Sequence, residues 1–326
     1  MKPPPRWTAT RSPRESPSPR GLNTLHIRGI IVNDETSYRS IWSHLATVEH
    51  RQAWVTTGDF DTRYVETGKR GNPPLIMIHG TGGSWEAFCA NIGPLSEHFN
   101  CFALDMVGCG YTGKPDRPYE IAEHVAQIVR FMDALELKTA SLVGISMGSW
   151  TASRFALAHP ERTERLVILS AFGLSDDQEE IGAILTRRGK AFDAPTWASV
   201  KDVFDKLILD EANRIDDLIG LRLQTYSQPA MKAAGENILA VFKPEPLARN
   251  LVTPDEWRRI EVPTLIVVAV DDRPLYVKTA RTLAGYIPGA TAVEVSGVGH
   301  WPQFEAPEKI NGLVSGFLRG QARTGR

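Results

Sequence analysis

Cysteine, net charge and long apolar runs are all scarce in this sequence of 326 residues. Three cysteines are too few, and odd in number, for a disulfide framework, so buried free thiols and a cytoplasmic protein are expected. A formal net charge of -1 offers no basis for binding nucleic acid or an anionic membrane surface. No segment approaches the roughly 18 to 20 consecutive apolar residues that cross a bilayer, which predicts no membrane-spanning helix.

The sequence also lacks the patterns that hold metals and nucleotides. Its eight histidines show no paired ligand spacing, so no metal site is expected. No glycine-rich loop resembles a phosphate-binding loop, and we therefore predict no cofactor. A small-molecule substrate remains as the expected binding partner.

The order of predicted elements divides the chain into a tail, an arm, a core and a cap. Residues 1–20 are rich in proline, arginine and serine, and residues 1–33 are expected to form a disordered tail. Residues 34–50 have apolar side chains at helical spacing and are expected to form a helical arm. The core comprises 51–173 and 257–320, whereas 174–256 are helix-prone, contain no strand-like run and predict a helical cap, or lid.

The core alternates strand signals with helix signals. After a predicted antiparallel hairpin around residue 58, predominantly apolar runs recur at 75–78, 102–104, 140–145, 166–169 and 264–270. Such runs are typical of parallel strands that are covered on both faces. The pattern predicts an α/β protein with a doubly wound, mostly parallel sheet and a helical lid inserted between strands 6 and 7.

The five residues 144–148, Gly-Ile-Ser-Met-Gly, carry the clearest chemical signal. A predicted buried strand precedes them and a helix-like stretch follows, which is the setting of a nucleophile elbow. The turn is so tight that both glycines are needed, and it holds Ser146 in a strained conformation with its hydroxyl exposed. We predict that Ser146 is the nucleophile of a hydrolase; the alternative is a plain glycine-rich turn.

A serine nucleophile needs a base, and the base needs an acid that orients it. In this architecture the three residues follow the order serine, acid, histidine. His300 comes directly after the last predicted strand, and Asp271 and Asp272 come directly after the strand that follows the cap. We predict His300 as the base and Asp272 as the acid, with Asp271 as the alternative acid.

The negative charge that develops on an attacked carbonyl needs two fixed N–H donors. Met147, immediately after the nucleophile at the helix start, is expected to supply one. The loop after the strand at 75–78 is expected to supply the other, from Thr81 or, as second choice, Gly82.

These motifs together resemble the α/β-hydrolase superfamily over about residues 50–320. The resemblance implies the α/β-hydrolase fold, and it implies that Asp105 organises a loop. The matching residues are His79-Gly80-x-Gly82, Asp105-x-x-Gly108-x-Gly110-x-Thr112, Gly144-x-Ser146-x-Gly148, Asp272 and Gly299-His300.

Within the superfamily the chain is most similar to the meta-cleavage product hydrolases, which open C–C bonds in ring-fission products of catechols. The similar segments are 146–148, 271–273 and 300–301. The resemblance implies that Arg222 holds a substrate carboxylate and that the protein forms a homodimer. It also implies substrate contacts from the residues Trp301, Gly82 and Ile145.

Two function hypotheses follow for the same serine, aspartate and histidine. The first is cleavage of a C–C bond in a 2-hydroxy-6-oxo-dienoate, a vinylogous diketone of aromatic catabolism, with attack by Ser146 or by an activated water. The second is a carboxylesterase or lactonase, which Ile145 and Ala87 favour because this family often has polar residues there. A ligand receptor on a hydrolase fold is a third class, but such a role does not require all three residues.

Overall fold

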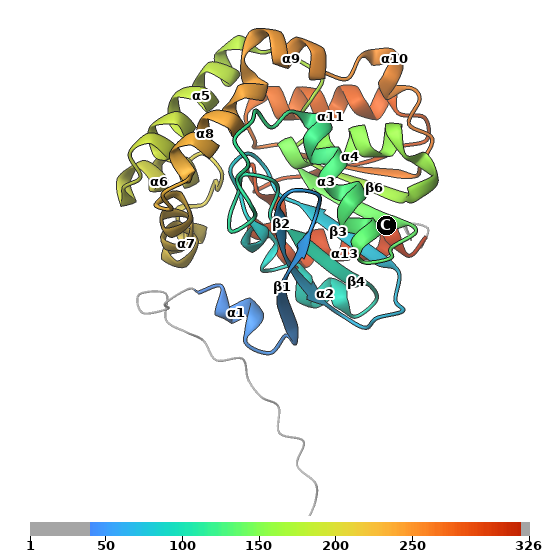
Figure 1. Ribbon diagram of the computed structural model, residues 1–326. Coiled ribbons are helices and arrows are strands. Elements are labelled where there is room, and N and C mark those ends of the chain that lie inside the picture. Colours follow the sequence, from blue (N-terminus) through green and yellow to red (C-terminus); the bar gives the residue numbers. More distant parts are fainter. Residues whose placement is uncertain (1–39, 321–326) are drawn as a thin grey trace, which may run out of the picture. The chain divides into compact units, whose positions relative to one another are not determined.

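The computed structural model describes residues 40–320, which are built around one eight-stranded sheet (Figure 1). Apolar runs make the central strands β5 and β7 buried along their whole length, and β3 buried after Pro74, as the sequence predicts. The strands are β1 His50–Thr56, β2 Asp61–Thr67, β3 Pro74–Ile78, β4 Asn100–Leu104, β5 Ala140–Ile145, β6 Thr163–Leu169, β7 Thr264–Ala269 and β8 Thr291–Val295.

The strand order is β1-β2-β4-β3-β5-β6-β7-β8. β1 and β2 form the predicted antiparallel hairpin, β2 pairs antiparallel with β4, and all later pairs are parallel. The predicted doubly wound, mostly parallel sheet is therefore confirmed. The parallel strands β3, β5, β6, β7 and β8 deliver the loops at their carboxyl ends to one edge, where open α/β sheets bind ligands.

Helices flank this sheet, with α4 packed on β3, β5 and β6 and α11 packed on β7 and β8. The α-helices of the core are α1 Trp42–Leu45, α2 Ile92–Ser96, α3 Ile121–Ala134, α4 Met147–Ala158, α11 Pro274–Tyr286, α12 Pro302–Glu305 and α13 Pro307–Leu318. Two 3₁₀ turns, η1 Trp85–Phe88 and η2 Pro160–Arg162, complete the core.

The chain between β6 and β7 is helical, and we call it the cap. Its helices α5 to α8 gather on one side of the described part of the chain, and α9 and α10 lead back to the sheet (Figure 1). The elements are α5 Gln178–Asp193, α6 Trp197–Phe204, η3 Glu211–Asn213, α7 Asp216–Tyr226, α8 Met231–Leu239, η4 Ala240–Phe242, α9 Pro244–Asn250 and α10 Pro254–Trp257. This all-helical segment leaves and re-enters the sheet at adjacent strands, because β6 pairs with β7.

Within residues 40–50, the part of the predicted helical arm that the structure describes, the helix is shorter than expected. The described part of it contains the single helical turn Trp42–Leu45, and His50 already belongs to β1. The reason is strand pairing, since β1 is in register with β2 from His50 opposite Thr67 onward. The predicted tail at 1–33 and the start of the arm lie outside the described residues.

Within residues 40–320, no helix combines the length and apolarity that crossing a bilayer requires. The three cysteines, Cys89, Cys101 and Cys109, are buried and free, as the sequence predicts.

Candidate active site

The turn between β5 and α4 has the geometry of a nucleophile elbow. Ser146 has φ 56° and ψ −122°, a strained conformation for a residue with a side chain, and its N–H donates to the Leu169 carbonyl at 3.1 Å. A Cβ on Gly144 would lie 2.2 Å from the Gly148 oxygen, and a Cβ on Gly148 would lie 2.1 Å from the Ile78 oxygen. Both flanking positions therefore require glycine.

The loops after β7 and β8 bring Asp272 and His300 together. Asp272 Oδ2 lies 2.8 Å from His300 Nδ1, and the two side chains are only 2% and 3% exposed. The neighbouring Asp271 instead accepts a hydrogen bond from the Gly297 N–H at 2.7 Å. The geometry therefore assigns Asp272 as the partner of His300 and gives Asp271 a role in shaping a turn.

The environment favours a neutral imidazole next to a charged carboxylate. Burial lowers the pKa of His300, and the nearby Asp272 only partly opposes this effect. Burial alone would raise the pKa of Asp272, but His300 and Arg273 outweigh it, so the pKa of this carboxyl is lowered. A neutral imidazole held by a carboxylate can accept a proton at neutral pH.

The lowered pKa of His300 predicts an asymmetric pH profile. A general base works only when deprotonated, so kcat/KM should fall as pH drops through the pKa of His300. Because that pKa is lowered, we expect the acid limb of kcat/KM to bend below pH 6.5, the usual pKa of histidine being about 6.5. Steady-state rates between pH 4.5 and 8 in constant ionic strength would measure it. An inflection above pH 6.5 would contradict the assignment of His300 as a buried neutral base.

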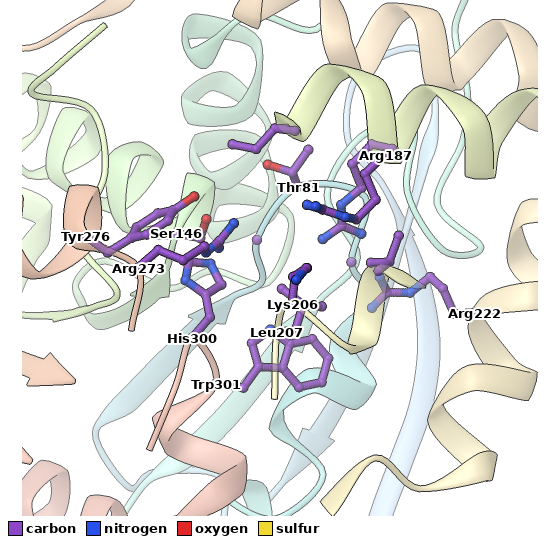
Figure 2. A pocket seen from close by; sticks show the side chains of 15 residues that line it. Thr81, Ser146, Arg187, Lys206, Leu207, Arg222, Arg273, Tyr276, His300 and Trp301 are labelled. Atoms are coloured by element: carbon purple, nitrogen blue, oxygen red, sulfur yellow. The ribbon is translucent and has the colours of Figure 1, made fainter. Parts of the chain in front are cut away.

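Tyr276 is a site residue that the sequence analysis missed. It is buried in the first turn of α11, its ring centroid lies 4.2 Å from that of His300, and its hydroxyl interacts with the Ser146 side chain (Figure 2). The available signal was its spacing: a helix that begins shortly after Asp272 places its first turn next to the site. Burial raises the pKa of Tyr276, which keeps the phenol protonated.

The loop after β3 passes directly beside the nucleophile. A Cβ on Gly80 would lie 3.1 Å from the Ser146 Cβ, and Thr81 lines the same cavity as Ser146. The Gly83 N–H donates to the Gly80 carbonyl at 3.0 Å and is therefore not free. In the described part of the chain, neither Thr81 nor Met147 donates its N–H to a backbone carbonyl, so both stay available as oxyanion donors.

His79 shapes this loop through hydrogen bonds of both ring nitrogens. Its Nε2 accepts from the Met106 N–H at 2.9 Å, so its Nδ1 carries the proton and donates to the Gly80 oxygen at 2.7 Å. Burial lowers the pKa of His79 to about 4, which keeps the ring neutral.

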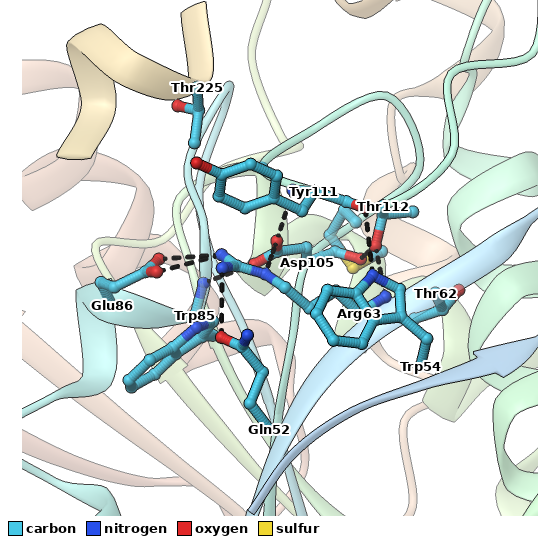
Figure 3. Close-up of polar contacts among 12 residues, drawn as sticks. Gln52, Trp54, Thr62, Arg63, Trp85, Glu86, Asp105, Tyr111, Thr112 and Thr225 are labelled. Carbon is cyan, nitrogen blue, oxygen red and sulfur yellow. Dashed lines mark hydrogen bonds and ion pairs between the residues drawn. The ribbon is translucent and has the colours of Figure 1, made fainter. Parts of the chain in front are cut away.

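A buried charge cluster of Arg63, Glu86 and Asp105 holds the chain that follows this loop (Figure 3). Arg63 Nε pairs with Asp105 Oδ2 at 2.5 Å, and Arg63 Nη2 lies 3.0 Å from Glu86. Asp105 also accepts from the N–H groups of Trp85 and Tyr111, at 2.8 and 2.9 Å. Asp105 thus organises two loops, which agrees with the role that the family resemblance implies.

A cavity next to Ser146 and His300 carries a concentration of positive charge, shown in Figure 2. Within residues 40–320, no carboxylate lines it. Its five cationic lining residues are Arg187, Arg188, Lys206, Arg222 and Arg273. Four of them come from the cap, and such a wall favours an anionic ligand.

Two of these cations are paired with carboxylates, whereas a buried nitrogen of Arg222 has no hydrogen-bond partner among the described residues. Arg273 forms an ion pair with Glu180, and Arg187 lies 3.3 Å from Asp202. Arg222 is 4% exposed, and its buried Nη1 has no hydrogen-bond partner among the described residues. Its guanidinium lies against aromatic rings, 5.3 Å from the Phe204 centroid, which leaves its polar edge for a ligand.

Of the other three predicted substrate contacts, Trp301 lines the cavity and the remaining two do not. Trp301 lines the cavity and also packs edge-on against Phe204. Ile145 is fully buried at the end of β5 and does not line the cavity, because strand residues alternate in direction. Gly82 also does not line the cavity and lies under cap side chains.

Comparison with known proteins gives consistent matches. Residues 75–313 match the model of the alpha/beta hydrolase family. The chain is 31% identical over 254 residues to a 2-hydroxymuconate semialdehyde hydrolase of Pseudomonas sp. (strain CF600), covering 75% of this chain and 86% of the relative. It is 29% identical over 281 residues to a 2-hydroxy-6-oxo-6-(2'-aminophenyl)hexa-2,4-dienoic acid hydrolase of Metapseudomonas resinovorans, covering 83% and 92%.

A solved structure supports the same similarity in three dimensions. The meta-cleavage product hydrolase of Pseudomonas fluorescens IP01 superposes with a TM-score of 0.73 at 26% identity. The match covers 83% of this chain and 98% of that one.

Proposed function

This chain belongs to the alpha/beta hydrolase family, and we propose that it is a serine-type hydrolase that cleaves a C–C bond in a 2-hydroxy-6-oxo-dienoate. Such vinylogous diketones are the ring-cleavage products of aromatic catabolism. The names of the relatives support this substrate class, since they act on compounds of the same type. The observation in this molecule that carries the proposal is the buried, unpaired Arg222 in the cavity of Ser146 and His300.

In the proposed reaction, the dienol first loses its 2-hydroxyl proton and takes up a proton at C5, which converts it to its 2,6-dioxo tautomer. The Ser146 hydroxyl then adds to the C6 carbonyl, His300 accepts its proton, and Asp272 stabilises the resulting imidazolium. The N–H groups of Met147 and Thr81 hold the oxyanion.

The C5–C6 bond breaks when the tetrahedral intermediate collapses. Its electron pair is delocalised through the alkene onto the 2-oxo group, and the proton held by His300 gives a 2-hydroxypenta-2,4-dienoate. Water, deprotonated by His300, then hydrolyses the acyl group on Ser146 to a carboxylic acid. Arg222 would hold the dienoate carboxylate throughout, which orients C6 toward the nucleophile.

Ester or lactone hydrolysis is the alternative, because the same three residues can form an acyl-enzyme from an ester. The cationic cavity disfavours it, since a neutral ester leaves Arg222 without a partner. The deciding measurement is stopped-flow absorbance with yellow 2-hydroxy-6-oxo-6-phenylhexa-2,4-dienoate, run in parallel with short-chain p-nitrophenyl esters. Rapid bleaching with much weaker ester turnover supports C–C cleavage. Persistent yellow colour with fast ester turnover would move the assignment to an esterase or lactonase.

Replacing Arg222 with methionine should separate the two substrate classes. Loss of a buried charge-assisted contact costs about 2 to 5 kcal/mol, so kcat/KM for the dienoate should fall at least 30-fold. Turnover of a neutral p-nitrophenyl ester should change by less than about threefold. The matched control is Arg258→Met at the C-cap of α10, a half-exposed arginine that pairs with Asp255 and does not line the cavity. Equal losses on both substrates would argue that Arg222 only supports the cap.

We also propose a cytoplasmic location. The cysteines are free, and burial raises the pKa of the Cys89 and Cys109 thiols to about 12, so these thiols stay protonated. Buried thiols without disulfides are typical of a reducing compartment. Recovery of the protein in a secreted fraction would contradict this location.

A further inference from the structure

A tyrosine of the cap is hydrogen-bonded to the loop beside the nucleophile. Tyr226, the last residue of α7, is 3% exposed, and its hydroxyl donates to the Gly82 carbonyl at 2.9 Å. The two residues are 144 positions apart in the chain. Tyr226 does not line the cavity, so it does not compete for substrate contacts.

Arg188 determines the direction of this hydrogen bond. Arg188 Nη1 lies 3.1 Å from the Tyr226 oxygen, and a guanidinium can only donate. The phenol oxygen must therefore accept from Arg188, which leaves its single hydrogen for the Gly82 carbonyl. The positive charge also polarises the O–H group and strengthens it as a donor.

Packing holds Tyr226 and Gly82 in contact. The Tyr226 ring lies 4.6 Å from the Phe192 ring, and a Cβ on Gly82 would lie 2.7 Å from both side chains. Gly82 has φ +59°, a conformation that favours glycine. Phe192 is itself pressed against α8, because a Cβ on Gly235 would lie 2.5 Å from it. Side chains of the cap therefore pack directly against the backbone of this loop at Gly82.

The peptide between Gly82 and Gly83 is consequently held at both ends. Its carbonyl accepts from Tyr226, and its N–H donates to the Gly80 carbonyl at 3.0 Å. Rotation of this peptide would break both bonds and displace the preceding Thr81–Gly82 peptide, and through it the Gly80–Thr81 peptide, which carries the Thr81 N–H. The Thr81 N–H is the donor that this loop contributes to the proposed oxyanion hole, together with that of Met147.

We propose that Tyr226 is a positioning residue that sets the oxyanion loop, and that the oxyanion hole is complete only when the cap is seated on Gly82. The chain Arg188–Tyr226–Gly82 connects a cationic wall that binds the anionic end of the substrate to the donors that stabilise the transition state. The cap therefore contributes to the chemical step and not to binding alone. This inference rests on the proposed serine-hydrolase function, but not on which bond is cleaved.

The test uses Tyr226→Phe and a small fluorophosphonate, which reacts with an activated serine and needs the oxyanion hole. Removing one oxyanion donor typically costs 10² to 10³ in rate, and a misplaced donor should cost less. We expect the inactivation rate constant to fall at least tenfold in Tyr226→Phe. Arg188→Met should act in the same direction with a smaller effect, because the phenol can then turn away. The matched control is Tyr119→Phe, which removes a buried tyrosine hydroxyl that donates to the Pro115 carbonyl away from the site.

A second readout separates positioning from a general loss of structure. The dissociation constant of a 2-hydroxy-6-oxo-dienoate, measured on a Ser146→Ala background, should change less than threefold in Tyr226→Phe, so that kcat falls while binding persists. A wild-type inactivation rate in Tyr226→Phe would overturn the proposal, and so would an equal loss of dienoate binding. If the wild-type protein reacts with the fluorophosphonate but does not cleave dienoates, the C–C hydrolase assignment fails while the role of Tyr226 is still measured.

Discussion

Replacing Ser146 with alanine is expected to lower kcat for C–C cleavage by at least about 10⁴-fold, because the nucleophile is lost and the remaining groups act only through binding and the oxyanion hole. The strained φ of 56° at Ser146 shows that the fold holds this side chain at the cavity at a cost in backbone energy. Stopped-flow bleaching of the dienoate, under single-turnover conditions, would measure the loss. Substrate should still bind, because Arg222 and the cap are unchanged.

The matched control for this substitution is Ser153→Ala. Ser153 lies on the same helix α4, is also buried, and donates to the Ser149 carbonyl at 2.8 Å without lining the cavity. It should retain wild-type turnover within a few-fold. If Ser146→Ala instead keeps more than about 1% of the wild-type rate, water activated by His300 attacks the C6 carbonyl and Ser146 is not the nucleophile.

Replacing Asp272 with asparagine should lower kcat by about 10⁴-fold, although the side chain keeps its shape. The Asp272 carboxylate accepts from His300 Nδ1 at 2.8 Å, which leaves Nε2 free to take the serine proton. An amide in this position can offer its own N–H to Nδ1 and select the opposite tautomer. It also cannot stabilise the imidazolium that forms during the reaction. The pH profile of kcat/KM and the turnover rate of the variant would check both effects.

The neighbouring aspartate provides the control for this experiment. Asp271→Asn removes a carboxylate one position away, which caps the Gly297 N–H and does not reach His300. Its turnover should stay within about threefold of wild type. A larger loss in Asp271→Asn than in Asp272→Asn would mean that the two aspartates have the opposite roles, the alternative that the sequence leaves open.

The candidate active site is formed by two parts of the chain, the core and the cap. Ser146, Asp272 and His300 come from loops at the carboxyl edge of the sheet, whereas Arg188, Arg222 and most of the cationic wall come from the cap. In the proposed reaction, the substrate would contact both parts at once. In this arrangement, the hydrogen bond between Tyr226 and Gly82 couples the position of the cap to that of the loop beside the nucleophile.

The local sequence was sufficient for the elbow, for the succession of strands along the chain and for His300 as the base, and it limited the acid to Asp272 or Asp271. A Cβ at 144 would collide with the turn itself and a Cβ at 148 with the neighbouring strand β3, and both collisions arise wherever this elbow forms, so a short motif indicates it. Asp272 and His300 each follow an apolar strand directly, and parallel strands in one sheet end at the same edge. Their approach therefore follows from the chain order and needs no knowledge of helix packing.

Only the tertiary structure decided which side chains face the cavity and how the cap meets the sheet. Tyr276, Arg188 and Tyr226 carry no local motif, because their roles depend on the angles at which helices pack. Arg222 could be proposed from resemblance alone, but its burial without a partner depends on neighbours from the folded cap. The arm before β1 was predicted too long, since helical spacing at 34–50 yields to strand pairing at His50. Turn geometry and apolar strand runs depend on residues close together in the sequence, so they can be predicted from it. The contact between Tyr226 and Gly82 spans 144 positions and arises only when the cap packs onto the core.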